Sequence, residues 1–130
     1  MPQKILIIED DPATQRLVDY TLRREGFDVI SASNGLEGLR KAREESPNLI
    51  ILDVMLPGLD GFEICHRLRS EPETAGVLIL MFSAKAQEID KQTGMKVGAD
   101  DYLSKPAAPA AIVSKVKELL EPGGKGKGGG

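Results

Sequence analysis

The sequence predicts an α/β domain in which helices cover both faces of a doubly wound, five-stranded parallel sheet. Short apolar runs alternate five times with longer segments of helical periodicity. The runs are apolar at nearly every position, as is typical of parallel strands that are buried on both faces. A chain of 130 residues can bury its own core, and its 4% aromatic content predicts that this core is aliphatic.

The first strand is expected over residues 4–9 and the first helix over residues 12–25. Asp11 is a residue type that caps helices, and Pro12 suits the first helical position. The helix carries apolar side chains at i, i+4 spacing that are expected to face the core, namely Leu17, Val18, Thr21 and Leu22.

The second strand–helix unit repeats this pattern, with a strand over residues 27–32 and a helix over residues 35–45. Asn34 offers a cap for this helix, and Glu37 is the acidic residue three positions later. The third strand is expected over residues 49–53.

In the last part of the chain, Asp60 is expected to cap a helix that ends near residue 70. On this helix Cys65 lies on the apolar face and is expected to be buried, and His66 is then exposed. Asp100 and Asp101 are interpreted as a solvated turn. The remaining elements are expected over residues 77–82 (strand), 86–97 (helix), 101–103 (strand) and 109–120 (helix).

Polar side chains stand where the predicted strands end. Glu9, Asp10, Asp53 and Ser83 each follow or close an apolar run, and Lys105 lies just past the last one. Because parallel strands end at one edge of the sheet, these five residues should converge where such folds bind ligands. Carboxylates suit a divalent cation and a lysine suits a phosphate, so the sequence predicts a metal and phosphoryl site.

Four segments in this order resemble the receiver domain of bacterial two-component response regulators: residues 5–11, 52–61, 82–84 and 98–106. The resemblance assigns residues 1–121 to one receiver domain. It implies a flavodoxin-like fold, with strand order 2-1-3-4-5 and five flanking helices. Residues 122–130 form a tail rich in glycine and lysine that is expected to be disordered.

By position, the resemblance implies that Asp53 accepts a phosphoryl group from a sensor histidine kinase or a histidine phosphotransfer protein. Glu9, Asp10, Asp53 and the backbone carbonyl of Met55 would hold Mg²⁺, for which Mn²⁺ can substitute. Lys105 would contact the phosphoryl group. The protein is then a phosphoacceptor rather than an enzyme, promoting at most its own phosphorylation and slow dephosphorylation.

The resemblance also implies a conformational switch. Ser83 would donate a hydrogen bond to the phosphoryl group, and the aromatic ring of Tyr102 would turn inward in response. The peptide bond between Lys105 and Pro106 would be cis. The aspartyl phosphate would reshape the face formed by the last two helices and the strand between them.

Composition limits the partners. The formal net charge is −3 and no basic stripe is present, so direct nucleic-acid binding is not expected. No apolar stretch approaches the ~20 residues of a membrane span, and no secretory signal is recognisable. With a single cysteine, a cytoplasmic location is expected. The output would pass to a downstream effector protein or to an effector domain missing from this sequence.

Two other functions fit this architecture. The first is a Mg²⁺-dependent phosphohydrolase that forms an aspartyl intermediate. Phosphohydrolases of the haloacid dehalogenase type carry a second aspartate two residues after the nucleophile, and Met55 stands there. The second is a flavin or nucleotide carrier, but its phosphate would meet an acidic, glycine-free turn at residues 9–12.

Overall fold

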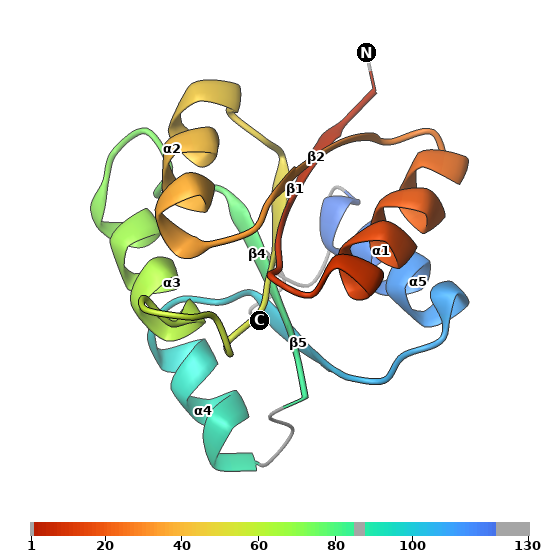
Figure 1. Ribbon diagram of the computed structural model, residues 1–130. Helices are drawn as coiled ribbons and strands as arrows, with labels where there is room; N and C mark the ends of the chain where they lie inside the picture. Colours follow the sequence, from red (N-terminus) through yellow and green to blue (C-terminus); the bar gives the residue numbers. More distant parts are fainter. Residues whose placement is uncertain (1, 85–87, 122–130) are drawn as a thin grey trace.

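Five parallel strands form the centre of the computed structural model, which describes residues 2–84 and 88–121. The strand order is β2-β1-β3-β4-β5, so the predicted fold class and order are confirmed. Each neighbouring pair is parallel (Figure 1). The strands are β1 (Lys4–Ile8), β2 (Asp28–Ala32), β3 (Leu49–Leu52), β4 (Leu78–Ser83) and β5 (Asp101–Ser104).

Helices cover both faces of the sheet. α1 and α5 lie on one face, and α2, α3 and α4 lie on the other (Figure 1). The helices are α1 (Pro12–Arg24), α2 (Gly35–Glu45), α3 (Gly61–Ser70), α4 (Glu88–Lys96) and α5 (Pro109–Leu120). The predicted start of α4 at residue 86 and the predicted tail lie outside the described residues.

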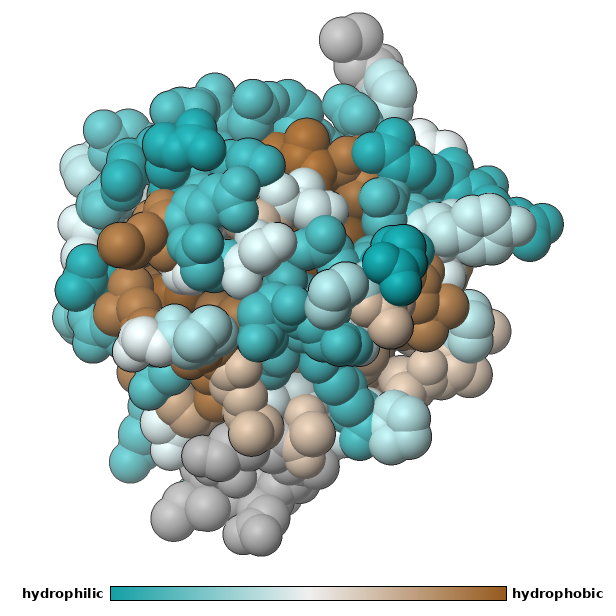
Figure 2. Space-filling model, viewed as in Figure 1, coloured by the Kyte–Doolittle hydropathy of each residue, from teal (hydrophilic) through white to brown (hydrophobic). Residues whose placement is uncertain are grey.

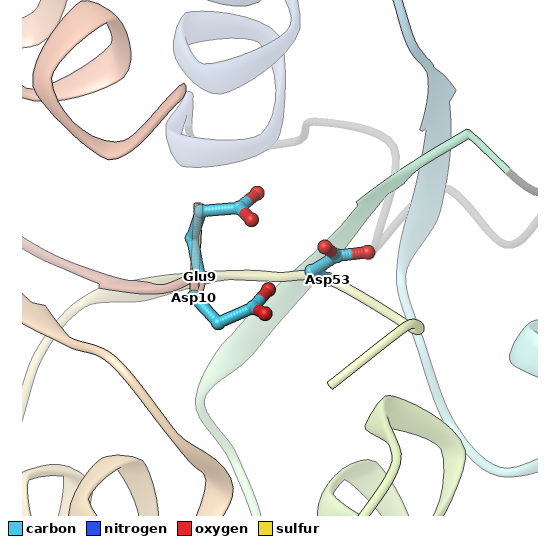
Figure 3. Close-up of side chains that lie close together, drawn as sticks. All are labelled: Glu9, Asp10 and Asp53. Carbon is cyan, nitrogen blue, oxygen red and sulfur yellow. The ribbon is translucent and has the colours of Figure 1, made fainter. Parts of the chain in front are cut away.

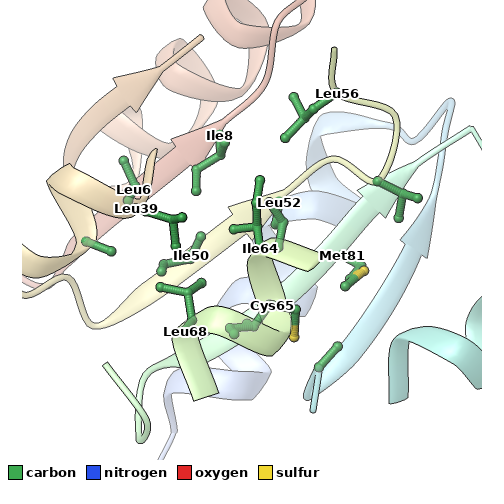
Figure 4. Close-up of a cluster of buried hydrophobic side chains, with 14 of the residues drawn as sticks. Leu6, Ile8, Leu39, Ile50, Leu52, Leu56, Ile64, Cys65, Leu68 and Met81 are labelled. Carbon is green, nitrogen blue, oxygen red and sulfur yellow. The ribbon is translucent and has the colours of Figure 1, made fainter. Parts of the chain in front are cut away.

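The sheet separates two hydrophobic clusters. Alternate residues of each strand face opposite sides, so Ile5 and Ile7 pack towards α1 and α5. Leu6 and Ile8 pack on the other side against α2 and α3, as part of the cluster in Figure 4. This burial on both faces explains why the strand segments are apolar at almost every position.

Side-chain caps fix where three of the helices begin. Asp11, Asn34 and Asp60 each accept a hydrogen bond from the backbone N–H three residues later, at 2.9 to 3.0 Å. Glu37 reaches back in turn, and its Oε1 accepts a bond from the Ser33 N–H at 2.8 Å. These caps satisfy N–H groups that the helix itself leaves free.

Two side-chain predictions for the helices are confirmed and one is wrong. Cys65 is fully buried and His66 is exposed. Leu17 was expected in the core but is 46% exposed. It precedes the buried Val18 on α1, where only a narrow stripe of the helix meets the sheet.

The prediction of a solvated turn at Asp100 and Asp101 is also wrong. Asp101 begins β5 and is 8% exposed, with its Oδ2 2.9 Å from Lys115 Nζ. Asp100 accepts a bond from Arg69 at 2.9 Å. Lys115 on α5 and Arg69 on α3 therefore offset the cost of burying these two carboxylates. Composition alone could not reveal these partners.

Polar side chains cover most of the face shown in Figure 2, with separate apolar patches between them. Within the described ranges, no helix combines the length and apolar character that a membrane span requires.

Candidate metal and phosphoryl site

Three carboxylates meet at the carboxyl edge of the two central strands. Glu9 and Asp10 follow β1, and Asp53 follows β3. The register pairs Ile8 with Leu52, and the Asp53 N–H continues the ladder to the Ile8 carbonyl at 3.1 Å. Each of the three carboxylates has an oxygen within 4.8 Å of the others (Figure 3).

Lys105 reaches this cluster from the end of β5. Its Nζ lies 2.6 Å from Glu9 Oε1 and 3.3 Å from Asp53 Oδ2. It also lies 5.4 Å from the centroid of the Phe82 ring, which adds a cation–π contact. A single ammonium group thus bridges two of the three carboxylates.

Burial and the contacts between Glu9 and Lys105 shift the pKa values of both groups. It raises the pKa of the Glu9 carboxyl above its ordinary value, although hydrogen bonds from Lys105 and from the Asp11 N–H oppose the rise. Burial alone would lower the pKa of Lys105, but its hydrogen bond to Glu9 and the charge of Asp53 raise that pKa overall. Lys105 is therefore a stable cation at neutral pH.

Backbone amides orient two of the carboxylates. Asp53 Oδ1 accepts a bond from the Met55 N–H at 3.0 Å. Glu9 Oε2 accepts one from the Asp11 N–H at 3.0 Å. Each carboxylate is thereby held by the turn that follows its own strand, and its second oxygen faces Lys105.

Two further residues support the site and were not predicted from the sequence. The Gln15 side chain on α1 donates a bond to the Glu9 carbonyl at 2.9 Å, and nothing in the local pattern marks it. Gly61 lets α3 approach the end of β3, because a Cβ there would lie 2.4 Å from the Asp53 carbonyl oxygen. The aspartate–glycine pair at 60–61 signalled a helix start but not this close approach.

Ser83 and Tyr102 lie on neighbouring strands. Ser83 is fully buried at the end of β4, and its carbonyl accepts a bond from the Lys105 N–H at 3.0 Å. Tyr102 is 9% exposed and belongs to the cluster on the side of α3. Because the register pairs Met81 with Tyr102 and Ser83 with Ser104, Ser83 and Tyr102 face the same side of the sheet. The Lys105–Pro106 peptide bond is cis, the isomer that the resemblance implies.

An open hollow of about 440 Å³ adjoins Asp10, the exposed carboxylate of the cluster. Asp10, Met55, Asp60 and Phe62 are among the residues that line it, and Met55 is 55% exposed. The hollow therefore opens beside Asp10 and the turn that follows Asp53.

Comparison with known proteins identifies a family that this chain matches. Residues 5–117 match the family described as the response regulator receiver domain. The alkaline phosphatase synthesis transcriptional regulatory protein PhoP of Bacillus subtilis is 48% identical over 120 residues, which cover 92% of this chain and 49% of PhoP. The chain thus spans about half the length of the curated relatives it matches.

Solved structures show the same fold. The chemotaxis protein CheY4 of Vibrio cholerae superposes with a TM-score of 0.88 at 31% identity, covering 92% of this chain and all of CheY4. The receiver domain of the sensor histidine kinase PA1611 of Pseudomonas aeruginosa, with a magnesium ion coordinated in its active site cleft, superposes with a TM-score of 0.84 at 28% identity. That match covers 92% of this chain and 98% of the other. The sequence and the fold together show that this chain belongs to the response regulator receiver domain family.

Proposed function

We propose that this chain is a phosphorylation-dependent signalling switch in which Asp53 accepts a phosphoryl group from a phosphohistidine. The supporting observation is the cluster of three carboxylates within 4.8 Å of one another, two of them bridged by Lys105. Membership of the receiver family supports the same assignment.

In the transfer step, a carboxylate oxygen of Asp53 forms a bond to phosphorus. The bond between phosphorus and the imidazole nitrogen of the donor breaks, and its electron pair stays on that nitrogen. Lys105 lies where it can exchange its contact with Asp53 Oδ2 for a phosphoryl oxygen. The Met55 N–H already holds the other oxygen of Asp53, which keeps the carboxylate oriented.

The residues present suit Mg²⁺. Glu9, Asp10 and Asp53 supply carboxylate oxygens and Met55 a backbone carbonyl, which are the hard donors that this ion prefers. Burial is the main cause of the raised pKa of Glu9, and the nearby negative charge of Asp53 adds to the rise. When bound, Mg²⁺ would offset the charge of the transferring phosphoryl group. The magnesium ion in the PA1611 receiver domain supports this proposal.

We assign the response to Ser83 and Tyr102. Ser83 ends the strand beside β5, and Tyr102 shares its side of the sheet. A hydroxyl that donates to a phosphoryl oxygen would draw in the end of β4 and change the packing around Tyr102. The face formed by α4, β5 and α5 would then carry the signal.

The proposed partners are a sensor histidine kinase or a histidine phosphotransfer protein. Relatives such as PhoP are transcriptional regulators about twice as long as the matched segment. We therefore propose that the output passes to an effector domain or protein. With a net charge of −3, this domain would not bind nucleic acid itself.

The test is incubation with Mg²⁺ and acetyl phosphate, followed by intact-protein mass spectrometry. The wild-type chain should gain one phosphoryl group and Asp53→Asn should gain none. Asp28→Asn, which removes an exposed carboxylate at the start of β2, is the matched control and should behave like wild type. Equal uptake by Asp53→Asn would refute the assignment.

The alternative function, a phosphohydrolase, predicts turnover on added phosphoesters. The position two residues after Asp53 is Met55, whose side chain is exposed and carries no transferable proton. We expect negligible hydrolysis of p-nitrophenyl phosphate, and sustained turnover that Asp53→Asn abolishes would favour the alternative.

A further inference from the structure

Arg69 joins two chain connections that precede neighbouring strands. It lies in the last turn of α3, near the edge of the sheet opposite the carboxylates. Its Nε donates to the Gly98 carbonyl at 2.9 Å, just before β5. Its Nη1 donates to the carbonyls of Ala75 at 3.0 Å and Val77 at 2.6 Å, just before β4. One planar guanidinium group thus fixes the relative position of both connections.

Asp100 completes this arrangement. Its Oδ2 accepts a bond from Arg69 Nη2 at 2.9 Å and another from the Ile79 N–H at 2.8 Å. The Asp100 N–H donates to the Ile79 carbonyl at 2.8 Å. The side chains of Arg69 and Asp100 are only 22% and 20% exposed, so water screens this ion pair less than a surface pair.

The packing of the same segment leaves little freedom. Gly98 has a φ of +111°, and a Cβ there would lie 2.8 Å from Arg69 Cγ. The Cys65 thiol, also on α3, lies 3.5 Å from the Val97 carbonyl. Two side chains of α3 therefore hold the segment from Val97 to Asp100, which connects the end of α4 to the start of β5.

We propose that Arg69 is a positioning residue that anchors the α4–β5 connection, so that α4 responds to phosphorylation by turning about this fixed end. The anchor concerns the unphosphorylated protein alone, and the turn of α4 rests on the proposed function of Asp53. The geometry favours a turn because α4 begins soon after Ser83 at the carboxyl edge of the sheet and ends at Lys96, just before the segment that Arg69 contacts at the opposite edge.

The anchor is tested on unphosphorylated protein by amide hydrogen exchange. Arg69→Met keeps an unbranched apolar stem but removes every donor. Exchange at Ile79 and Asp100 should quicken about tenfold or more relative to the core amide of Ile7. Arg67→Met is the matched control, because Arg67 sits on the same helix, is 48% exposed and pairs only with Glu63 among the described contacts.

Arg69→Lys provides a milder variant that retains the charge. An ammonium group has three donors on one atom and cannot reproduce the planar fork that bonds four acceptors on the two connections, so exchange at Ile79 and Asp100 should again exceed that of Arg67→Met. If both Arg69 variants exchanged these amides no faster than Arg67→Met, the anchor would be refuted.

The turn of α4 is tested by amide chemical shifts before and after phosphorylation. In wild type, changes should be large at Ser83 and small from Val97 to Asp100. In Arg69→Met they should extend through Val97 to Asp100, while the rate of phosphorylation stays within about twofold because Arg69 lies at the opposite edge. Large wild-type changes from Val97 to Asp100 would overturn the fixed end. If wild type took up no phosphate, the proposed function would fail, and the exchange experiment would still decide the anchor.

Discussion

At the scale of the residue, the site depends on a close contact between two backbone segments as well as on its charged groups. Gly61 brings the first turn of α3 against the end of β3, and its N–H donates to the Val54 carbonyl at 2.9 Å. A methyl group at this position would meet backbone atoms of Asp53 and Val54 at 2.4 and 2.7 Å. Backbone atoms cannot move aside as a flexible side chain can, so the carboxylate of Asp53 would shift with them.

Gly61→Ala should therefore lower the free energy of unfolding by about 1–3 kcal/mol and slow phosphorylation of Asp53. Urea unfolding and the acetyl phosphate assay measure the two effects. Gly76→Ala is the control, because a Cβ at Gly76 meets nothing within 4 Å. If the two variants unfolded at the same urea concentration and were phosphorylated equally fast, the close approach would not matter.

The acidic residues and Lys105 could be anticipated from the sequence because they interrupt apolar runs at strand ends. Their convergence follows from the parallel sheet alone. The roles of Gln15 and Arg69 could not be anticipated, because both bind backbone carbonyls outside their own helices, 6 residues away for Gln15 and 29 for Arg69. A carbonyl acceptor is available at every residue, so the sequence carries no signal for such a contact.

At the scale of the element, helix starts are more predictable than strand ends. Asp11, Asn34 and Asp60 cap their helices as the sequence predicts, because a cap is a contact between residues three apart. The predicted strand over residues 49–53 instead ends at Leu52 in the structure. The end of a strand depends on its neighbour in the sheet, which local sequence does not specify.

The start of α2 should respond to pH through Glu37. The hydrogen bond from the Ser33 N–H lowers the pKa of Glu37 below its ordinary value. A carboxylate with a lowered folded-state pKa stabilises the protein above its unfolded-state pKa of about 4.3, and this contribution is lost as pH falls through the folded-state pKa. Glu37→Gln should thus cost about 0.5 kcal/mol near neutral pH, and the difference should vanish in more acidic solution.

Urea unfolding of wild type and Glu37→Gln over a pH series measures this difference. Glu73→Gln, at an exposed glutamate in the connection between α3 and β4, serves as the control. A cost of Glu37→Gln that stayed constant down to pH 3 would show that the charge of Glu37 does not contribute through this cap.

At the scale of the whole molecule, the site concentrates negative charge at the carboxyl edge of the sheet. If Glu9, Asp10, Asp53 and Lys105 are all ionised, the local sum of charges is −3 + 1 = −2. Like charges this close repel one another. A cation that binds only the folded state should therefore stabilise the whole domain.

Mg²⁺ should accordingly raise the melting temperature. The gain in unfolding free energy at a Mg²⁺ concentration 100 times Kd is about 2.7 kcal/mol. Asp10→Asn should abolish most of this gain and raise the melting temperature measured in EDTA, since one repelling charge is gone. Differential scanning calorimetry with and without Mg²⁺ measures both effects, with Asp28→Asn as the control. An unchanged response of Asp10→Asn to Mg²⁺ would argue against its role as a ligand.

The contacts of Lys105 have a consequence for how the protein is made. They join residues 96 and 52 positions apart in the sequence. A ribosome must therefore release nearly the whole domain before the two carboxylates and the lysine can meet. A nascent chain, or one truncated before β5, carries all three carboxylates but lacks Lys105. A phosphate donor that requires Lys105 beside Asp53 would not phosphorylate such chains. Only molecules that have finished folding would then carry the phosphoryl group.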